Sequence, residues 1–187
     1  MITLGIDPGT LFTGFGLVEK DGKEIRAVDY GVISTTAKDE MPKRLKQIYD
    51  ALASKIEQRC PAKVSLETAF FGKNVQSALK LGQVRGVVMV LAMNYGLSIS
   101  EYSPREVKKS ITGNGNAAKE QVEFMVKKLL GLDDAKARAD AFDALAIALC
   151  DTLSRSPVQT VSSKSPTRKV TDWSKFVEAN PHLVVKP

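Results

Sequence analysis

Four carboxylates stand out in this sequence because of where their neighbours place them. Asp7 ends the apolar, β-branched run that opens the chain, and Glu67 ends a second short run of that kind. Asp140 and Asp143 lie three residues apart in an Ala- and Leu-rich stretch, so a helix presents both on one face. Two carboxylates about 4 Å apart repel by roughly 4 kcal/mol at an effective dielectric near 20. A cluster of four therefore stays ionised only with a compensating cation.

The compensating cation that suits such a cluster is Mg²⁺, with Mn²⁺ as a substitute, because every ligand is an oxygen. Two such ions about 3.5–4 Å apart clamp the attacking water and the leaving oxygen in phosphoryl transfer, so we expect two ions per subunit. The simpler alternative for Asp140 and Asp143 is a solvated helix face near a helix N-terminus. The single histidine, His182, lies near the C-terminus, which argues against Ser-His or Cys-His catalysis. Cys60 and Cys150 form no zinc-binding pattern.

The first acid is positioned by a predicted strand and hairpin. Pro8 directly follows Asp7 and ends the first strand, which occupies residues 1–6. Two further strand-like runs, at 13–20 and 24–36, flank an Asp-Gly pair that signals a hairpin, so we expect an antiparallel meander. Glycines 9, 14 and 16 leave room for a phosphate or a second strand to approach the backbone.

The rest of the chain alternates helices with strands, which predicts an α/β fold with a partly parallel sheet. If the first strand and the strand that ends in Glu67 are parallel neighbours, both acids lie at one edge of the sheet. Asn116 is the expected N-cap of the helix that follows it. The expected elements are helix 42–59, strand 62–67, helix 75–95, strand 97–103, a short helical stretch at 105–111, and helices 117–130 and 136–154.

Helix 75–95 is apolar on more than one face, which indicates either burial within the domain or a self-association surface. Leu79, Val87, Val90 and Leu91 are expected to face the sheet. Gly82 and Gly86 lie four residues apart and permit close approach of another helix. The residues expected on the second apolar face are Gly82, Gly86, Val88, Met89 and Met93, of which Gly82, Gly86, Met89 and Met93 are predicted to form a homodimer interface.

Charge and composition favour a nucleic acid as partner. The net charge is +6 and the sequence pI is about 9.3, which suits a polyanion. No apolar run is long enough to span a membrane, and no secretory signal or disulfide framework is evident, so we expect a cytoplasmic protein. The 187 residues suit one domain, expected at 1–156. Residues 157–187 read as a flexible, Pro/Ser/Thr/Lys-rich linker and tail of unknown role.

These motifs, taken together and in order, resemble the RuvC family of bacterial Holliday junction resolvases. The segments that carry the resemblance are GIDPGTLFTGFG, LETAFFGKNVQSALKLGQVRGV, PREVKKSITGNGNAAKEQV and ADAFDALAIALC, and they span residues 2–150. The DPGT turn alone is not specific, because actin-like ATPases carry a similar turn. That class needs two such domains around a nucleotide, and this chain is too short for both.

The resemblance implies a ribonuclease H-like fold, with a mixed sheet of five strands flanked by helices and the first three strands antiparallel. It implies a homodimer that uses Mg²⁺ to make symmetric paired nicks in four-way DNA junctions, leaving 5′ phosphates and 3′ hydroxyls. Recombination and DNA repair, with RuvA and RuvB as partners, are the implied setting. The implied metal-binding and catalytic residues are Asp7, Glu67, Asp140 and Asp143, and the implied DNA-binding residues are Phe70 (with Phe71 as an alternative), Lys73, Lys108 and Lys119.

Two alternative functions stay open from the sequence. One is another nuclease of the same fold, for example one that cuts RNA–DNA hybrids. The other is a junction-binding protein without catalysis, which a substituted acid would favour; all four acids are present here.

Overall fold

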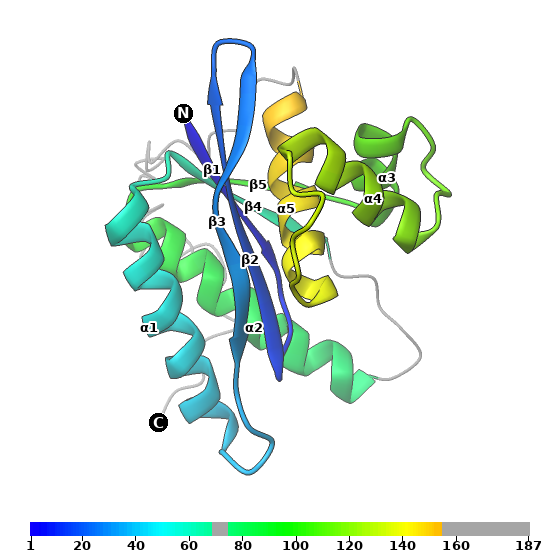
Figure 1. The fold of residues 1–187 in the computed structure, drawn as a ribbon. Helices are drawn as coiled ribbons and strands as arrows, with labels where there is room; N and C mark the ends of the chain where they lie inside the picture. Colours follow the sequence, from blue (N-terminus) through cyan, green and yellow to red (C-terminus); the bar gives the residue numbers. More distant parts are fainter. Residues whose placement is uncertain (69–74, 155–187) are drawn as a thin grey trace, which may run out of the picture.

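The computed structural model describes residues 1–68 and 75–154, which form a five-stranded mixed sheet with helices on both faces (Figure 1). The strand order is β3-β2-β1-β4-β5. The first three strands pair antiparallel, while β4 runs parallel to both β1 and β5, as the sequence predicts. The strands are β1 (Ile2–Asp7), β2 (Phe12–Asp21), β3 (Glu24–Ser34), β4 (Lys63–Glu67) and β5 (Ser98–Tyr102).

The helices divide into two layers, one on each face of the sheet (Figure 1). One layer holds α1 (Met41–Arg59) and α2 (Val75–Asn94). The other holds α3 (Pro104–Thr112), α4 (Lys119–Leu130) and α5 (Ala139–Leu153). Among the helices of the described residues, none has the length and hydrophobicity needed to cross a bilayer.

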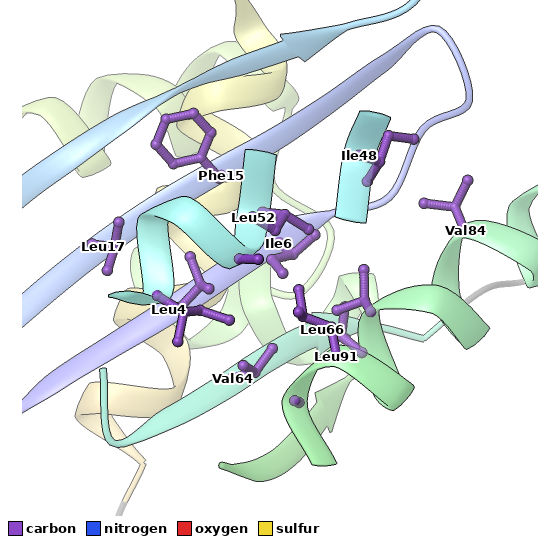
Figure 2. Close-up of a cluster of buried hydrophobic side chains, with 14 residues drawn as sticks. Leu4, Ile6, Phe15, Leu17, Ile48, Leu52, Val64, Leu66, Val84 and Leu91 are labelled. Carbon is purple, nitrogen blue, oxygen red and sulfur yellow. The ribbon is translucent and has the colours of Figure 1, made fainter. Parts of the chain in front are cut away.

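The central strand β1 supplies side chains to both layers because its residues alternate between the two faces. Leu4 and Ile6 are fully buried in the core under α1 and α2 (Figure 2). Gly5 instead meets the backbone of α5 on the opposite face. By this alternation Asp7 lies on the α5 side, so the face that carries the acid is the face that α5 covers.

Two helix starts differ from the predicted positions by two residues or more. Helix α4 begins at Lys119 with Ala118 as N-cap, not at residue 117 with Asn116 as cap. The Asn116 amide donates to Asn114 Oδ1 (3.0 Å), so an Asx-type turn uses this segment instead. Helix α5 begins at Ala139 rather than at residue 136, because the chain passes through a turn before it. Neither shift moves an acid off its helix.

The prediction of which face α2 buries was wrong at several positions. Val84, Val88, Leu91 and Ala92 are buried against the sheet, and Met89 packs partly against this core. Val88 and Met89 therefore do not belong to the outer face, and Met89 is removed from the predicted interface. Because the helix is apolar nearly all round, hydrophobic spacing could not distinguish its two faces. The outer stripe consists of Val75, Leu79, Gly82, Gly86, Val90 and Met93.

Candidate active site

Helix α5 reaches the first acid because glycines let its backbone lie directly on the sheet. Gly14 of β2 is the register partner of Asp7, and a Cβ built on Gly14 would lie 1.9 Å from the Asp140 carbonyl oxygen. A Cβ on Gly5 would likewise lie 2.2 Å from the Ala144 carbonyl oxygen. The close approach predicted at Gly9, Gly14 and Gly16 is confirmed: α5 approaches Gly14 and Gly16, and the Phe12 backbone of β2 approaches Gly9. The contact with α5 brings Asp140 and Asp143 over the end of β1.

The second acid reaches the same edge through parallel strand pairing. Strands β1 and β4 pair up to Ile6 and Leu66, so Asp7 and Glu67 follow at the ends of two adjacent parallel strands. The carboxyl ends of parallel strands are where open α/β sheets bind ligands. The arrangement expected from the sequence for these two acids is therefore present.

The turn after Asp7 is held in place by a buried arginine on α1. Arg44 is only 8% exposed, and its Nε donates to the Thr10 carbonyl (3.1 Å) and to Thr35 Oγ1 (3.2 Å). The Thr13 hydroxyl donates to the Gly9 carbonyl (2.6 Å) from the other side of the turn. These bonds fix the backbone that leaves Asp7, so the carboxylate sits on a constrained support.

Two cations pair with the acids of α5. Lys119 Nζ lies 2.5 Å from Asp143 Oδ2, and Arg138 Nε lies 3.2 Å from Asp140 Oδ2. The Arg138 guanidinium also stacks over the Phe12 ring, 3.7 Å from its centroid. Lys119 was expected near the site from the family resemblance. Arg138 was not, although a basic residue two positions before Asp140 is visible in the sequence.

These two cations do not balance the negative charge of the cluster. Burial, followed by the charges of Asp143, Glu67 and Asp140, raises the pKa of Asp7 to about 7. Burial and then Asp143 raise the pKa of Glu67. Burial also raises the pKa of Asp143, against the opposing effect of Lys119. The site therefore disfavours four ionised carboxylates and has a deficit of positive charge.

A divalent cation fits this donor set chemically, since the donors are oxygens that repel one another. Within residues 1–68 and 75–154, no three His, Cys, Asp or Glu side chains are arranged closely enough to hold a metal ion. The ion pairs with Lys119 and Arg138 each use one carboxylate oxygen, Oδ2 of Asp143 and Oδ2 of Asp140.

Beside the acids lies a cavity of about 200 Å³ that combines charge with an apolar wall. Glu67 and Asp143 line it together with Lys108 and Lys119, and Val107 and Val122 contribute to the apolar part of its wall. Two of the predicted DNA-binding lysines therefore border the acids. The other predicted DNA contacts, Phe70 and Lys73, and the alternative Phe71, lie outside the described residues.

A mixed five-stranded sheet with acids at the ends of two parallel strands, and two more on the helix across them, defines a ribonuclease H-like nuclease. The sequence model of the family described as "Crossover junction endodeoxyribonuclease RuvC" matches residues 3–151. The chain belongs to this RuvC family.

Individual relatives agree with this assignment. The crossover junction endodeoxyribonuclease RuvC of Chloroherpeton thalassium is 52% identical over 186 residues, covering 100% of both chains. That of Pelobacter propionicus is 46% identical over 176 residues, covering 94% of this chain and 99% of the relative. The structure of T. thermophilus RuvC in complex with a Holliday junction substrate superposes with a TM-score of 0.78 at 34% identity, covering 82% of this chain and 93% of that one. The yeast mitochondrial resolvase Ydc2 shares the fold alone, with a TM-score of 0.60 at 13% identity over 81% of this chain and 77% of the other.

Proposed function

We propose that this protein is a Holliday junction resolvase, a metal-dependent endonuclease that nicks four-way DNA junctions during recombination and repair. The observation that carries the proposal is the carboxylate cluster at one sheet edge, in which burial and then the neighbouring acids raise the pKa of Asp7 to about 7. Membership of the RuvC family and the Holliday junction bound by T. thermophilus RuvC support the junction as substrate.

The residues that would hold Mg²⁺ or Mn²⁺ are Asp7, Glu67, Asp140 and Asp143, with two ions per subunit. When bound there, such ions would supply the activation of a water and the stabilisation of the departing 3′ oxygen. Lys108 and Lys119 border the same cavity and place positive charge where a scissile phosphate enters. Asp7 loses its proton when cation binding makes the ionised cluster favourable. Phe70 and Lys73 complete the proposed DNA contacts.

We further propose a homodimer formed by the outer stripe of α2, which replaces the interface first expected from the sequence. Val75, Leu79, Val90 and Met93 are each more than half exposed. Among the residues that the structure describes, nothing lies within 4 Å of a Cβ built on Gly82 or Gly86, which leaves room for a partner helix. A two-fold axis here would place two sites on symmetry-related strands of a junction, which gives paired nicks.

The remaining proposals concern the cellular location, the partner proteins and the bounds of the nuclease domain. A DNA substrate and the RuvC family support a cytoplasmic location and cooperation with the RuvA and RuvB branch-migration proteins. The family match ends at residue 151 and α5 ends at Leu153, which supports a nuclease domain at 1–156. We assign no role to 157–187.

A substrate panel tests this function against its rivals. A synthetic four-way junction, a linear duplex and an RNA–DNA hybrid of matched sequence are incubated with the protein and Mg²⁺. We expect nicks in the junction alone, and none after chelation. Preferred cleavage of the hybrid would favour another ribonuclease H-like nuclease, and junction binding without any cleavage would favour a non-catalytic binder.

A further inference from the structure

Arg85, on the inner side of α2, connects this helix to the strand end that carries Glu67. Its side chain is only 15% exposed. One guanidinium nitrogen, Nη1, donates to the backbone carbonyl of Glu67, and the other, Nη2, pairs with the Glu101 carboxylate on β5. One half-buried cation of α2 therefore contacts both β4 and β5.

The backbone around Glu67, to which Arg85 donates, is also held by hydrogen bonds from β5. Glu67 is the register partner of Tyr102, and the Thr68 amide donates to the Tyr102 carbonyl (2.8 Å). The Thr68 hydroxyl donates to the same carbonyl (3.3 Å). Arg85 adds a restraint on this backbone from α2, at the Glu67 carbonyl.

The same helix presents its exposed stripe on the other side. Gly86 follows Arg85 directly and lies in that stripe, together with Val90. We propose that Arg85 is a positioning residue that aims Glu67 at the cation site and couples the seating of α2 against a second copy to the geometry of that site. This inference rests on the proposed function, because it takes Glu67 as a cation ligand.

Arginine is suited to this task because its planar fork offers two parallel sets of donors at once. A lysine at the same position is a single point charge that satisfies either the carbonyl or the carboxylate well, but not both. The chemistry therefore predicts that Arg85→Lys restores metal binding only partly. A purely electrostatic role would instead predict full rescue by lysine.

The experiment compares Arg85→Gln and Arg85→Lys with Lys80→Gln, which removes a charge from an exposed position of the same helix. Mn²⁺ binding is measured by calorimetry on the DNA-free protein, and the Mg²⁺ dependence of junction cleavage is measured at saturating DNA. Removing a group that orients a ligand weakens metal affinity about 10–100-fold, and we expect Arg85→Gln to fall in this range. Arg85→Lys should lie between Arg85→Gln and wild type, and Lys80→Gln should match wild type. Sedimentation and junction binding without metal should be unchanged in all three.

Wild-type Mn²⁺ affinity and Mg²⁺ dependence in Arg85→Gln would overturn the inference, and so would conversion of that variant to a monomer. If Arg85→Gln does not fold, Glu101→Ala removes one of the two anchors of the guanidinium instead. A smaller weakening of Mn²⁺ binding is then expected, and wild-type affinity would overturn the inference. Glu67→Gln distinguishes failure of the Arg85 inference from failure of the proposed function. Normal Mn²⁺ binding in that variant refutes the proposed cation site itself.

Discussion

Asp7 is the carboxylate with the least favourable surroundings for a negative charge. Burial, followed by the charges of three other acids, raises its pKa to about 7. Lys119 opposes this shift only as the smallest of the contributing effects. When Asp7 ionises, its charge destabilises the folded state, and a bound divalent cation would offset this effect. The free energy of unfolding and cation binding are therefore linked at this residue.

Asp7→Asn should therefore stabilise the metal-free protein at neutral and higher pH. The folded state of the wild type holds the Asp7 proton more tightly than the unfolded state does. The stability that this tighter proton binding contributes is complete below about pH 4 and is lost as the pH rises through about 7. We expect the variant to gain up to about 4 kcal/mol over wild type at pH 8 in chelator, with the gain vanishing near pH 4. Urea unfolding at several pH values measures this; a gain that does not depend on pH would contradict it.

At the residue scale, the four acids were predictable from local patterns, because two follow strand-like runs and two share a helical spacing. The roles of Arg138, Arg44 and Arg85 were not predictable in this way. Each acts on the site through contacts between elements far apart in the chain, such as Arg85 with the Glu67 carbonyl. No local spacing encodes such contacts, so their roles emerge only when the elements are packed.

Among the elements, α5 determines whether the acids meet at all. It crosses β1 and β2 with its backbone on Gly5 and Gly14, and alanines on its own surface permit the same closeness. The sequence showed small residues on both sides, but it did not show that they face one another. The site is thus assembled by a backbone contact rather than by long side chains.

Gly14→Ala should disrupt the site through this contact. The new Cβ would lie 1.9 Å from the Asp140 carbonyl oxygen, so the start of α5 must move. A displacement near 1 Å costs about 100-fold in rate, and overpacking costs about 1–3 kcal/mol of stability. Gly31→Ala is the control, since its Cβ would lie 3.1 Å from the Phe15 side chain, away from the acids. Equal cleavage rates in the two variants, measured on a junction with Mg²⁺, would contradict this account.

The other end of α5 is anchored by a buried ionic cluster. Asp151 is 4% exposed and pairs with Lys63 of β4, which is 8% exposed. Tyr102 of β5 donates to the same carboxylate (2.8 Å), and burial followed by this bond raises the pKa of Tyr102 to about 12. One carboxylate thus ties α5 to two strands of the sheet.

Asp151→Ala should lower the free energy of unfolding by about 3–5 kcal/mol, because it leaves the Lys63 ammonium buried without its partner. Asp50→Ala, which removes an exposed ion pair with Lys46, should cost less than about 1 kcal/mol. Chemical denaturation of both variants provides the comparison. Similar losses would show that the buried pair does not anchor the helix.

For the molecule as a whole, the proposed dimer face and the helix that carries Asp140 and Asp143 lie on opposite faces of the sheet (Figure 1). Helix α2 supplies the exposed stripe, and α5 supplies two acids. The fold class and strand arrangement were predictable, because alternating helices and strands and a hairpin signal constrain them strongly. The outward face of α2 was not, since both of its faces are apolar.

Val90→Glu should weaken the proposed dimer. Val90 is 57% exposed in the stripe, so the change leaves the core intact while placing charges near a two-fold axis. Loss of an interface hot spot raises Kd by at least about 30-fold. Leu129→Glu, at a 44% exposed position on α4, is the control and should stay dimeric. Sedimentation at micromolar concentration measures the oligomeric state of the wild type and both variants. A wild type that is monomeric at that concentration would refute the interface.

The central claim is that the carboxylate cluster around Asp7 cuts four-way junctions with the help of a divalent cation. The most direct test measures cleavage and binding of one labelled junction by wild type and Asp7→Asn in Mg²⁺. The account predicts symmetric paired nicks from wild type and none from Asp7→Asn, with junction affinity retained in the variant. Cleavage by Asp7→Asn at a rate near that of wild type would contradict it.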